Sequence, residues 1–246
     1  MYLQFDPPII AHRGASGYAP ENTIVAFDKA KQLGINWVEF DVMLASCKTP
    51  FIFHDETLDR TTNLTGEIAP YDYSSLSKLD AGSWFNSIYK DVRIPAFKET
   101  MDWLCRVGMS ANIEIKPLQG QDMETAEVIW QSAKDYIKPH HPTFLFSSFS
   151  IDSLRTLRTM TPDALIGLLI HDWMPDWKKI CDDLSCVSVH LFDEIVTLDR
   201  ATAIKSTGRK LLCYTVNDPD RAKELYSWGV DAVFSDFPDK ILSSLS

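Results

Sequence analysis

Short apolar runs alternate with segments of helical periodicity along almost the whole chain, and this alternation constrains the fold more than any other feature. Segments such as 22–34 and 220–229 place apolar residues three or four positions apart, as on one face of a helix. Eight shorter runs are typical of strands that other elements cover on both sides. These runs are residues 8–13, 37–44, 111–116, 143–149, 164–170, 186–192, 211–217 and 231–237. Eight strands alternating with helices most simply close into an α/β fold, the (β/α)8 TIM barrel, which carries functional residues at the C-terminal ends of its strands.

The length of 246 residues fits one such barrel, which needs roughly 250 residues. No internal repeat, low-complexity tract or linker divides the chain, so residues 1–246 are expected to form a single domain. One stretch interrupts the alternation, because an extra short strand near residues 51–53 is followed by many turn and aromatic residues. A loop this long in a compact domain usually has a function or a small fold of its own. We therefore expect a small inserted segment after the second strand, over approximately residues 56–97.

Charge and hydropathy exclude several kinds of partner. The chain has 24 basic and 34 acidic residues, for a net charge of −10, and the acidic residues are scattered. Such a surface repels nucleic acid and anionic membranes. The first residues lack the basic and long apolar segments of a signal peptide, and no later run reaches the ~18 apolar residues of a membrane span. We expect a cytoplasmic protein without stable membrane association, whose oligomeric state the sequence leaves open.

The cysteines argue against a disulfide framework or a zinc site. There are five, an odd number, and no two have the CxxC spacing of a metal-binding pair. We expect them to be reduced thiols that mostly fill the core.

Carboxylates occur at strand positions where they can face one another. Glu39 and Asp41 are two residues apart, so both side chains point to one side of their strand while the apolar residues around them point to the other. Glu114 has the same setting in another strand. Each of these residues alone could belong to a salt bridge or to a solvated strand face. Acids that face together need a cation, and oxygen ligands favour Mg²⁺ or Ca²⁺ over zinc.

Histidines and basic residues follow the same strand ends. His12 and Arg13 come directly after an apolar run, His54 follows the short extra strand, and Lys116 ends another strand. A packed histidine, or an ion pair of Arg13 with Glu21, could explain each residue singly. The whole set is better explained by a catalytic site, because burying uncompensated charge is costly. Phosphodiester cleavage fits this combination best, because cations can bind the anion and histidines can transfer protons near neutral pH.

Several blocks of sequence occur in an order that characterises one enzyme family. They are "AHRGASGYAPENTIVAF", "WVEFDVML", "FIFHDETLDRTTNLTG", "NIEIKP", "FSSF", "YTVN" and "GVDAVFSDFPD", and they span nearly the whole chain. In these blocks the chain resembles the glycerophosphodiester phosphodiesterase family. The resemblance implies a TIM barrel with a small insertion, a divalent metal ion (Mg²⁺ or Ca²⁺), and a small-molecule substrate. The implied reaction is hydrolysis of glycerophosphodiesters to sn-glycerol 3-phosphate and an alcohol.

The resemblance also implies a role for each candidate residue. The catalytic acid and base are His12 and His54, in an order left open; the phosphate contacts are Arg13 and Lys116; the metal ligands are Glu39, Asp41 and Glu114; and the ring that packs against glycerol is Tyr214. The family usually has tryptophan in place of this tyrosine, a departure that bears on substrate preference rather than on reaction type. In the mechanism proposed for the family, the glycerol 2-hydroxyl attacks phosphorus and water then opens the cyclic phosphate.

Two other functions are compatible with parts of the pattern. A lysophospholipase D of the same family would need an apolar surface beside the site, for which the inserted segment offers several aromatic residues. A non-catalytic protein that binds phosphodiesters would be expected to lose at least one of the histidines or acids, and this chain keeps them all.

Overall fold

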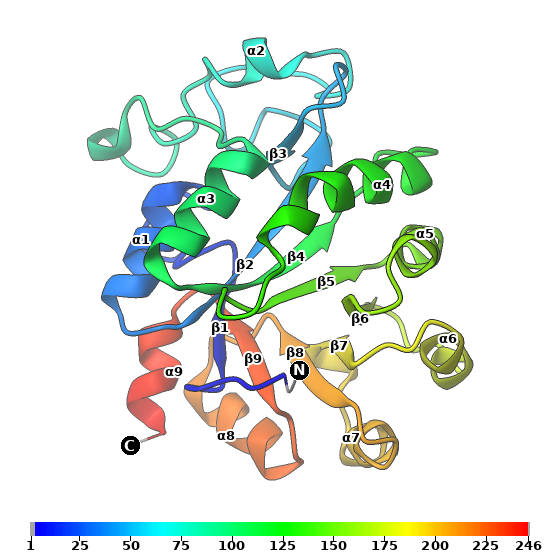
Figure 1. Cartoon of the computed structure of the whole chain (residues 1–246). Helices are drawn as coiled ribbons and strands as arrows, with labels where there is room; N and C mark the ends of the chain where they lie inside the picture. Colours follow the sequence, from blue (N-terminus) through cyan, green and yellow to red (C-terminus); the bar gives the residue numbers. More distant parts are fainter. Residues whose placement is uncertain (1–2, 246) are drawn as a thin grey trace.

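The structure is a computed structural model that describes residues 3–245, and its centre is a barrel of eight parallel strands (Figure 1). In order around the barrel these strands are β1 (Ile9–Ala11), β2 (Trp37–Leu44), β4 (Ser110–Ile115), β5 (Phe144–Ser148), β6 (Leu165–Ile170), β7 (Ser188–Phe192), β8 (Lys210–Tyr214) and β9 (Ala232–Ser235). The barrel closes because β1 pairs with both β2 and β9. The predicted (β/α)8 TIM barrel is confirmed.

Helices follow the strands and surround the barrel (Figure 1). They are α1 (Ile24–Gln32), α3 (Phe97–Val107), α4 (Asp122–Ala133), α5 (Ile151–Met160), α6 (Trp177–Asp183), α7 (Leu198–Lys205), α8 (Pro219–Ser227) and α9 (Pro238–Ser244), with short 3₁₀ turns η2 (Lys134–Tyr136) and η3 (Asp193–Ile195). In α1, particular residues of the local sequence set where the helix begins and ends. The side chain of Thr23 accepts a hydrogen bond from the amide of Ala26 at its start, and Gly34, with φ 82°, follows its end.

An inserted segment leaves the barrel after β2. Strand β3 (Pro50–Ile52) pairs antiparallel with the end of β2. Residues 53–96 then contain α2 (Tyr73–Leu76) and the 3₁₀ turn η1 (Ser87–Tyr89) before α3 begins. Phe51, Leu58 and Leu76 belong to a small buried apolar cluster that is distinct from the main core. Figure 1 shows this segment at one flank of the barrel, beside α3.

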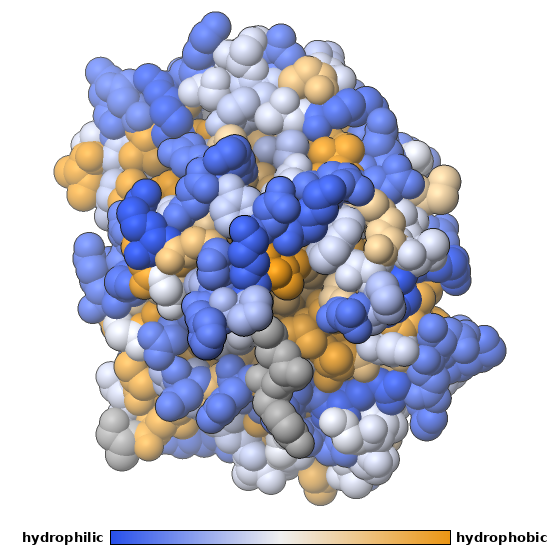
Figure 2. Space-filling view, in the orientation of Figure 1, coloured by the Kyte–Doolittle hydropathy of each residue, from blue (hydrophilic) through white to orange (hydrophobic). Residues whose placement is uncertain are grey.

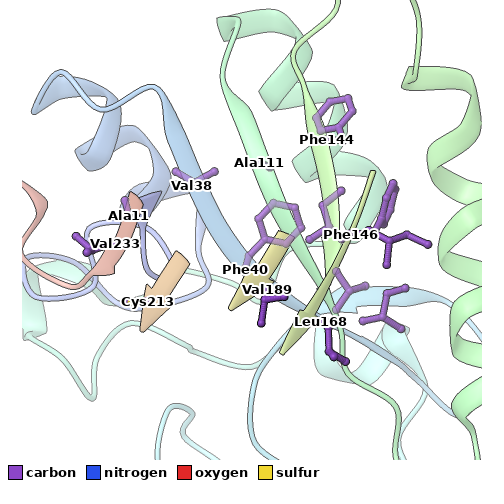
Figure 3. Packing of buried hydrophobic residues seen from close by; sticks show 14 of the residues in the cluster. Ala11, Val38, Phe40, Ala111, Phe144, Phe146, Leu168, Val189, Cys213 and Val233 are labelled. Carbon is purple, nitrogen blue, oxygen red and sulfur yellow. The ribbon is translucent and has the colours of Figure 1, made fainter. Parts of the chain in front are cut away.

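Alternation along the strands separates the main core from the barrel interior. Val38 and Phe40 of β2 point outward and are fully buried under the helices, where Phe40 contacts Phe27 of α1 and Phe97 of α3 with ring centroids 5.5 and 6.4 Å apart. Figure 3 shows Val38 and Phe40 packed with corresponding residues of the other strands. The residues between them, such as Glu39, therefore point into the barrel.

The interior is closed near the N-terminal ends of the strands. Leu3, Trp37 and Leu145 belong to one buried cluster there, and the rings of Phe5 and Trp37 pack in a tilted arrangement with centroids 4.8 Å apart. The N-terminal segment thus covers this end of the barrel, as its blue trace shows (Figure 1). Open space for a ligand is left at the C-terminal ends of the strands, as expected for this fold.

The surface in the view of Figure 2 is mostly hydrophilic, with scattered apolar patches. Within residues 3–245, no helix is long and apolar enough to cross a lipid bilayer. All five cysteines are free thiols, as the sequence predicted.

Candidate active site

One cavity of about 230 Å³ lies at the C-terminal ends of the barrel strands. Side chains from widely separated parts of the sequence line it, and they include seven of the eight predicted site residues: His12, Arg13, Glu39, His54, Glu114, Lys116 and Tyr214. The eighth, Asp41, lies directly behind the cavity wall, with only 2% of its side chain exposed. The fold therefore brings together the residues that the strand-end pattern singled out.

The three predicted metal ligands form a compact carboxylate cluster. Asp41 of β2 is paired in register with Glu114 of β4, and Glu39 precedes Asp41 by two residues on the same side of β2. One oxygen from each of the three carboxylates can be chosen so that all lie within 4.8 Å of one another. Burial and the charge of Asp41 raise the pKa of Glu114 to about 8, and burial together with Asp41 and Glu114 raises the pKa of Glu39 well above its usual range. The cluster holds more negative charge than its surroundings compensate.

Two cations partly balance this charge through Asp41. The Arg13 Nε atom lies 3.5 Å from Asp41 Oδ2, and the Lys116 Nζ atom lies 3.6 Å from Asp41 Oδ1. Burial would raise the pKa of Asp41, but Arg13 and Lys116 lower it to about 2. The negative charges of Glu39 and Glu114 are left for an added cation to balance. A donor set made only of oxygen atoms fits Mg²⁺ or Ca²⁺.

Arg13 takes a left-handed backbone conformation, with φ 54°, that turns its own amide toward the cluster. The amide donates a hydrogen bond to Glu39 Oε2 at 2.9 Å. Gly14 follows with φ 83°, and a side chain there would lie within 3 Å of Ala26 in α1. Glycine after Arg13 is therefore required both by the backbone angle and by the close approach of the helix.

Asn22 has the same conformation, with φ 57°, and ties the loop after β1 to β2. Its side chain donates to Asp41 Oδ2 at 2.9 Å and accepts from the Asp41 amide at 3.3 Å, while its own amide donates to the carbonyl of Arg13 at 3.0 Å. Sequence reasoning placed Asn22 in a matching block but gave it no role. Its position within that block was the available signal.

His12 is oriented by a carboxylate from the far end of the chain. Its Nδ1 atom lies 2.7 Å from Asp236 Oδ1, and Ser16 and Asn217 also donate to Asp236. Hydrogen bonds keep the pKa of Asp236 below its usual range despite burial, so the carboxylate accepts and His12 Nδ1 donates. The Nε2 atom of His12, 4.0 Å from Glu39 Oε2, is left for proton transfer. Burial and the charge of Arg13 lower the pKa of His12, which favours a neutral ring.

His54 has a matching partner in its own neighbour. Its Nδ1 atom lies 2.6 Å from Asp55 Oδ1, which leaves Nε2 for the cavity. Burial would raise the pKa of Asp55, but hydrogen bonds from His54 and Arg60 hold it below its usual range. Neither Asp55 nor Asp236 was among the predicted site residues, although both lie in the blocks that the resemblance used.

The opposite wall of the cavity is aromatic. Tyr214 donates a hydrogen bond from its hydroxyl to the carbonyl of Ile170 at 3.1 Å, and its ring contacts Phe149 and Phe192 with centroids 6.0 Å apart in both pairs. His171 stacks on Phe192 at 4.5 Å. Phe149 lines the cavity and is 47% exposed.

Arg13 also forms the ion pair with Glu21 that sequence left as an alternative explanation, with Nη1 and Oε1 2.8 Å apart. This pair does not remove Arg13 from the site, because Arg13 lines the same cavity as both histidines.

The charged and aromatic walls together could bind a small phosphodiester, and comparison with known proteins agrees with this chemistry. Residues 12–240 match the sequence model of the glycerophosphoryl diester phosphodiesterase family. A glycerophosphodiester phosphodiesterase of Caldanaerobacter subterraneus subsp. tengcongensis is 32% identical over 235 residues, which cover 96% of this chain and 96% of that protein.

Solved structures of phosphodiesterases are also similar to this chain. A phosphodiesterase of Oleispira antarctica, in complex with the product sn-glycerol-3-phosphate, superposes with a TM-score of 0.93 at 38% identity, and the match covers 97% of this chain and 96% of that one. A glycerophosphodiester phosphodiesterase from Agrobacterium tumefaciens gives a TM-score of 0.75 at 26% identity, with 96% and 98% covered. The chain belongs to the glycerophosphoryl diester phosphodiesterase family.

Proposed function

We propose that this protein hydrolyses glycerophosphodiesters to sn-glycerol 3-phosphate and an alcohol, with a divalent metal ion and two histidines. One observation carries the proposal: a single cavity is lined by two carboxylate-oriented histidines, two cations and members of a carboxylate cluster. The family and the product bound by the Oleispira antarctica relative support the substrate class. The whole chain would act as one domain, and its cytoplasmic location stays a prediction from the sequence.

The metal would be held by Glu39, Asp41 and Glu114. Their oxygen donors and their unbalanced negative charge fit Mg²⁺ or Ca²⁺. When bound, such an ion supplies positive charge that favours the charge developing on the phosphoryl oxygens. Arg13 and Lys116 supply further positive charge at the same wall, where they would hold the phosphate against the histidines.

The histidines would divide the proton transfers of one displacement. His12, whose lowered pKa favours the neutral ring, would accept the proton of the glycerol 2-hydroxyl as that oxygen attacks phosphorus. His54 would donate a proton to the oxygen of the departing alcohol as its bond to phosphorus breaks. In the second step His54 would take a proton from water as the water oxygen attacks the cyclic phosphate, and His12 would return its proton to the glycerol oxygen.

Cavity size favours a small head group over a lipid. About 230 Å³ is below the ~300–1,000 Å³ that is common for pockets that bind drug-sized ligands. Of the residues that a lysophospholipase D could use as an apolar surface, Tyr71 and Tyr73 pack against the core of the inserted segment, whereas Trp84 and Ile88 are 38% and 77% exposed. Tyr214 and its aromatic neighbours remain to pack against the carbon atoms of glycerol.

The proposal is tested by measuring head-group release from several glycerophosphodiesters with and without a chelator. Release should stop after dialysis against EDTA and return with Mg²⁺ or Ca²⁺. Full activity in excess EDTA would contradict the metal site. Choline release from lysophosphatidylcholine, measured beside release from glycerophosphocholine, distinguishes the lysophospholipase D, which would prefer the first substrate.

A further inference from the structure

Arg60 reaches from the inserted segment to two carboxylates beside the cavity. Its guanidinium donates to both oxygens of Asp55, at 2.7 and 2.9 Å, and to both oxygens of Glu21, at 2.5 and 2.8 Å. Asp55 follows β3 and Glu21 precedes α1, so one side chain joins two loops at the mouth of the barrel. A guanidinium can hold two carboxylates in this way because its donors form a rigid planar fork, whereas an ammonium group acts as a point charge.

Each of these carboxylates also holds a residue of the candidate active site. Asp55 Oδ1 accepts the hydrogen bond from His54 Nδ1 at 2.6 Å, and Glu21 Oε1 accepts the hydrogen bond from Arg13 Nη1 at 2.8 Å. His54 and Arg13 line the cavity, whereas Arg60 is not among the lining residues in the described part of the chain. The contacts of Arg60 with the site residues therefore run through these two carboxylates.

The inserted segment fixes the backbone around Arg60. Leu58 is fully buried in the core of this segment, and its carbonyl accepts hydrogen bonds from the amide and the hydroxyl of Thr62, at 3.2 and 2.8 Å. Asp59 accepts a hydrogen bond from the amide of Gly66 at 3.0 Å. The turn that carries Arg60 is thus held from both sides by contacts within the segment.

We infer that Arg60 is a positioning residue that orients His54 through Asp55 and Arg13 through Glu21, so that the inserted segment completes the active site. The inference rests on the proposed roles of His54 and Arg13. Arg60 is 44% exposed, so solvent screens its ion pairs in part, but a guanidinium that joins two carboxylates in a network still contributes to folding stability. The positioning role is therefore tested by a loss of turnover in protein that is still fully folded at the assay temperature.

Arg60→Ala tests this inference, with Arg93→Ala as a matched control. Arg93 lies in the same segment, is 45% exposed, and contacts only groups of that segment, namely the carbonyl of Lys78 and the carboxylate of Asp91. Loss of an orienting partner commonly costs about 10–100-fold in activity at metal sites, and we expect a loss in this range of kcat/KM for Arg60→Ala. Arg93→Ala should keep wild-type kcat/KM and melting temperature, and Arg60→Ala should lose kcat/KM at a temperature well below its own melting temperature. Wild-type kcat/KM in Arg60→Ala would overturn the inference.

A double-mutant cycle with Asp55→Asn separates positioning from a general structural effect. Because Arg60 also acts through Glu21, adding Arg60→Ala to Asp55→Asn should lower kcat/KM by less than Arg60→Ala alone does, and by much less when Glu21→Gln is also present. If the sites were independent, the fold losses in kcat/KM of the separate variants would multiply to within about twofold, and that result would overturn the inference. Should Arg60→Ala unfold, Arg60→Lys takes its place in the same cycle, because an ammonium group cannot hold both carboxylates as the fork does.

His54→Ala, assayed in parallel, separates this inference from the proposed function. If His54→Ala is inactive while Arg60→Ala is fully active, only the role of Arg60 is wrong. If His54→Ala keeps wild-type activity, the proposed mechanism itself fails.

Discussion

Replacing Glu114 with glutamine should stabilise the metal-free protein, which is the reverse of what losing a structural salt bridge would do. Glu114 faces Asp41 in register across neighbouring strands, and Lys116 forms its ion pair with Asp41 rather than with Glu114. Burial and the charge of Asp41 raise the pKa of Glu114 from 4.5 to about 8. Ionised Glu114 is therefore costly in the fold whenever no cation is bound.

The sign and size of the effect depend on pH. Because the pKa of Glu114 is higher in the fold than in the unfolded chain, its contribution to stability is fully present below about pH 4.5 and is lost as pH rises through about 8. Each pH unit in this window costs about 1.4 kcal/mol. Glutamine does not titrate, so the advantage of Glu114→Gln should grow across the window. For a chain of this size, each kcal/mol gained would raise Tm by about 2–4 °C.

The assay is thermal unfolding in EDTA between pH 5 and pH 9, with Glu127→Gln as a control. Glu127 is an exposed glutamate on α4, so its replacement should leave Tm unchanged at every pH. Added Mg²⁺ or Ca²⁺ should stabilise the wild type more than Glu114→Gln, because the variant has lost one ligand. A Tm of Glu114→Gln well below wild type at pH 8 in EDTA would refute this reasoning and make Glu114 a partner in a structural ion pair.

Three further predictions concern residues around the site. Asp236→Asn should lower kcat by about 10–100-fold in steady-state kinetics, because an amide cannot accept from His12, Ser16 and Asn217 together as the carboxylate does, so the ring of His12 loses its fixed orientation. His190→Leu should make the protein less sensitive to acid, because burial lowers the pKa of His190 to about 3 and the wild type therefore loses stability at this residue as pH falls below 6.5. Urea unfolding should show a smaller difference in stability between pH 7 and pH 4 in the variant than in the wild type. Asn22→Ala should destabilise the protein by about 1–3 kcal/mol in urea unfolding, since it removes hydrogen bonds to buried Asp41.

The barrel could be predicted from the sequence because each strand is buried on both sides. Runs such as 37–44 are nearly continuous in apolar residues, and the interruptions at Glu39 and Asp41 fall on the side that faces the cavity. Once the strands close into a barrel, polar residues at their C-terminal ends must converge. This geometry explains why residues predicted from separate strands meet at one cavity.

The partners of the site residues could not be predicted by the same reasoning. His12 and Asp236 are 224 positions apart, and no periodicity relates them. Arg60 lies in an irregular turn, whose conformation depends on contacts within the inserted segment rather than on a repeating pattern. Such pairs depend on tertiary distance, which strand and helix patterns do not encode.

The most direct test of the central claim is kcat of His12→Ala and His54→Ala on glycerophosphocholine and on a nitrophenyl ester of glycerol phosphate. Each variant should lose at least ~10²–10⁴-fold on glycerophosphocholine, and the double variant should lose much less than the product of the two. His140→Ala, a replacement of an exposed histidine that precedes β5 at the opposite end of the barrel, should keep wild-type rates.

The nitrophenyl substrate assigns the two roles, because its leaving group hardly needs a donated proton. His54→Ala should recover on this substrate and His12→Ala should not; the opposite result would exchange their roles. Near-wild-type rates of both single variants on glycerophosphocholine would contradict the account, because the histidines would then be structural.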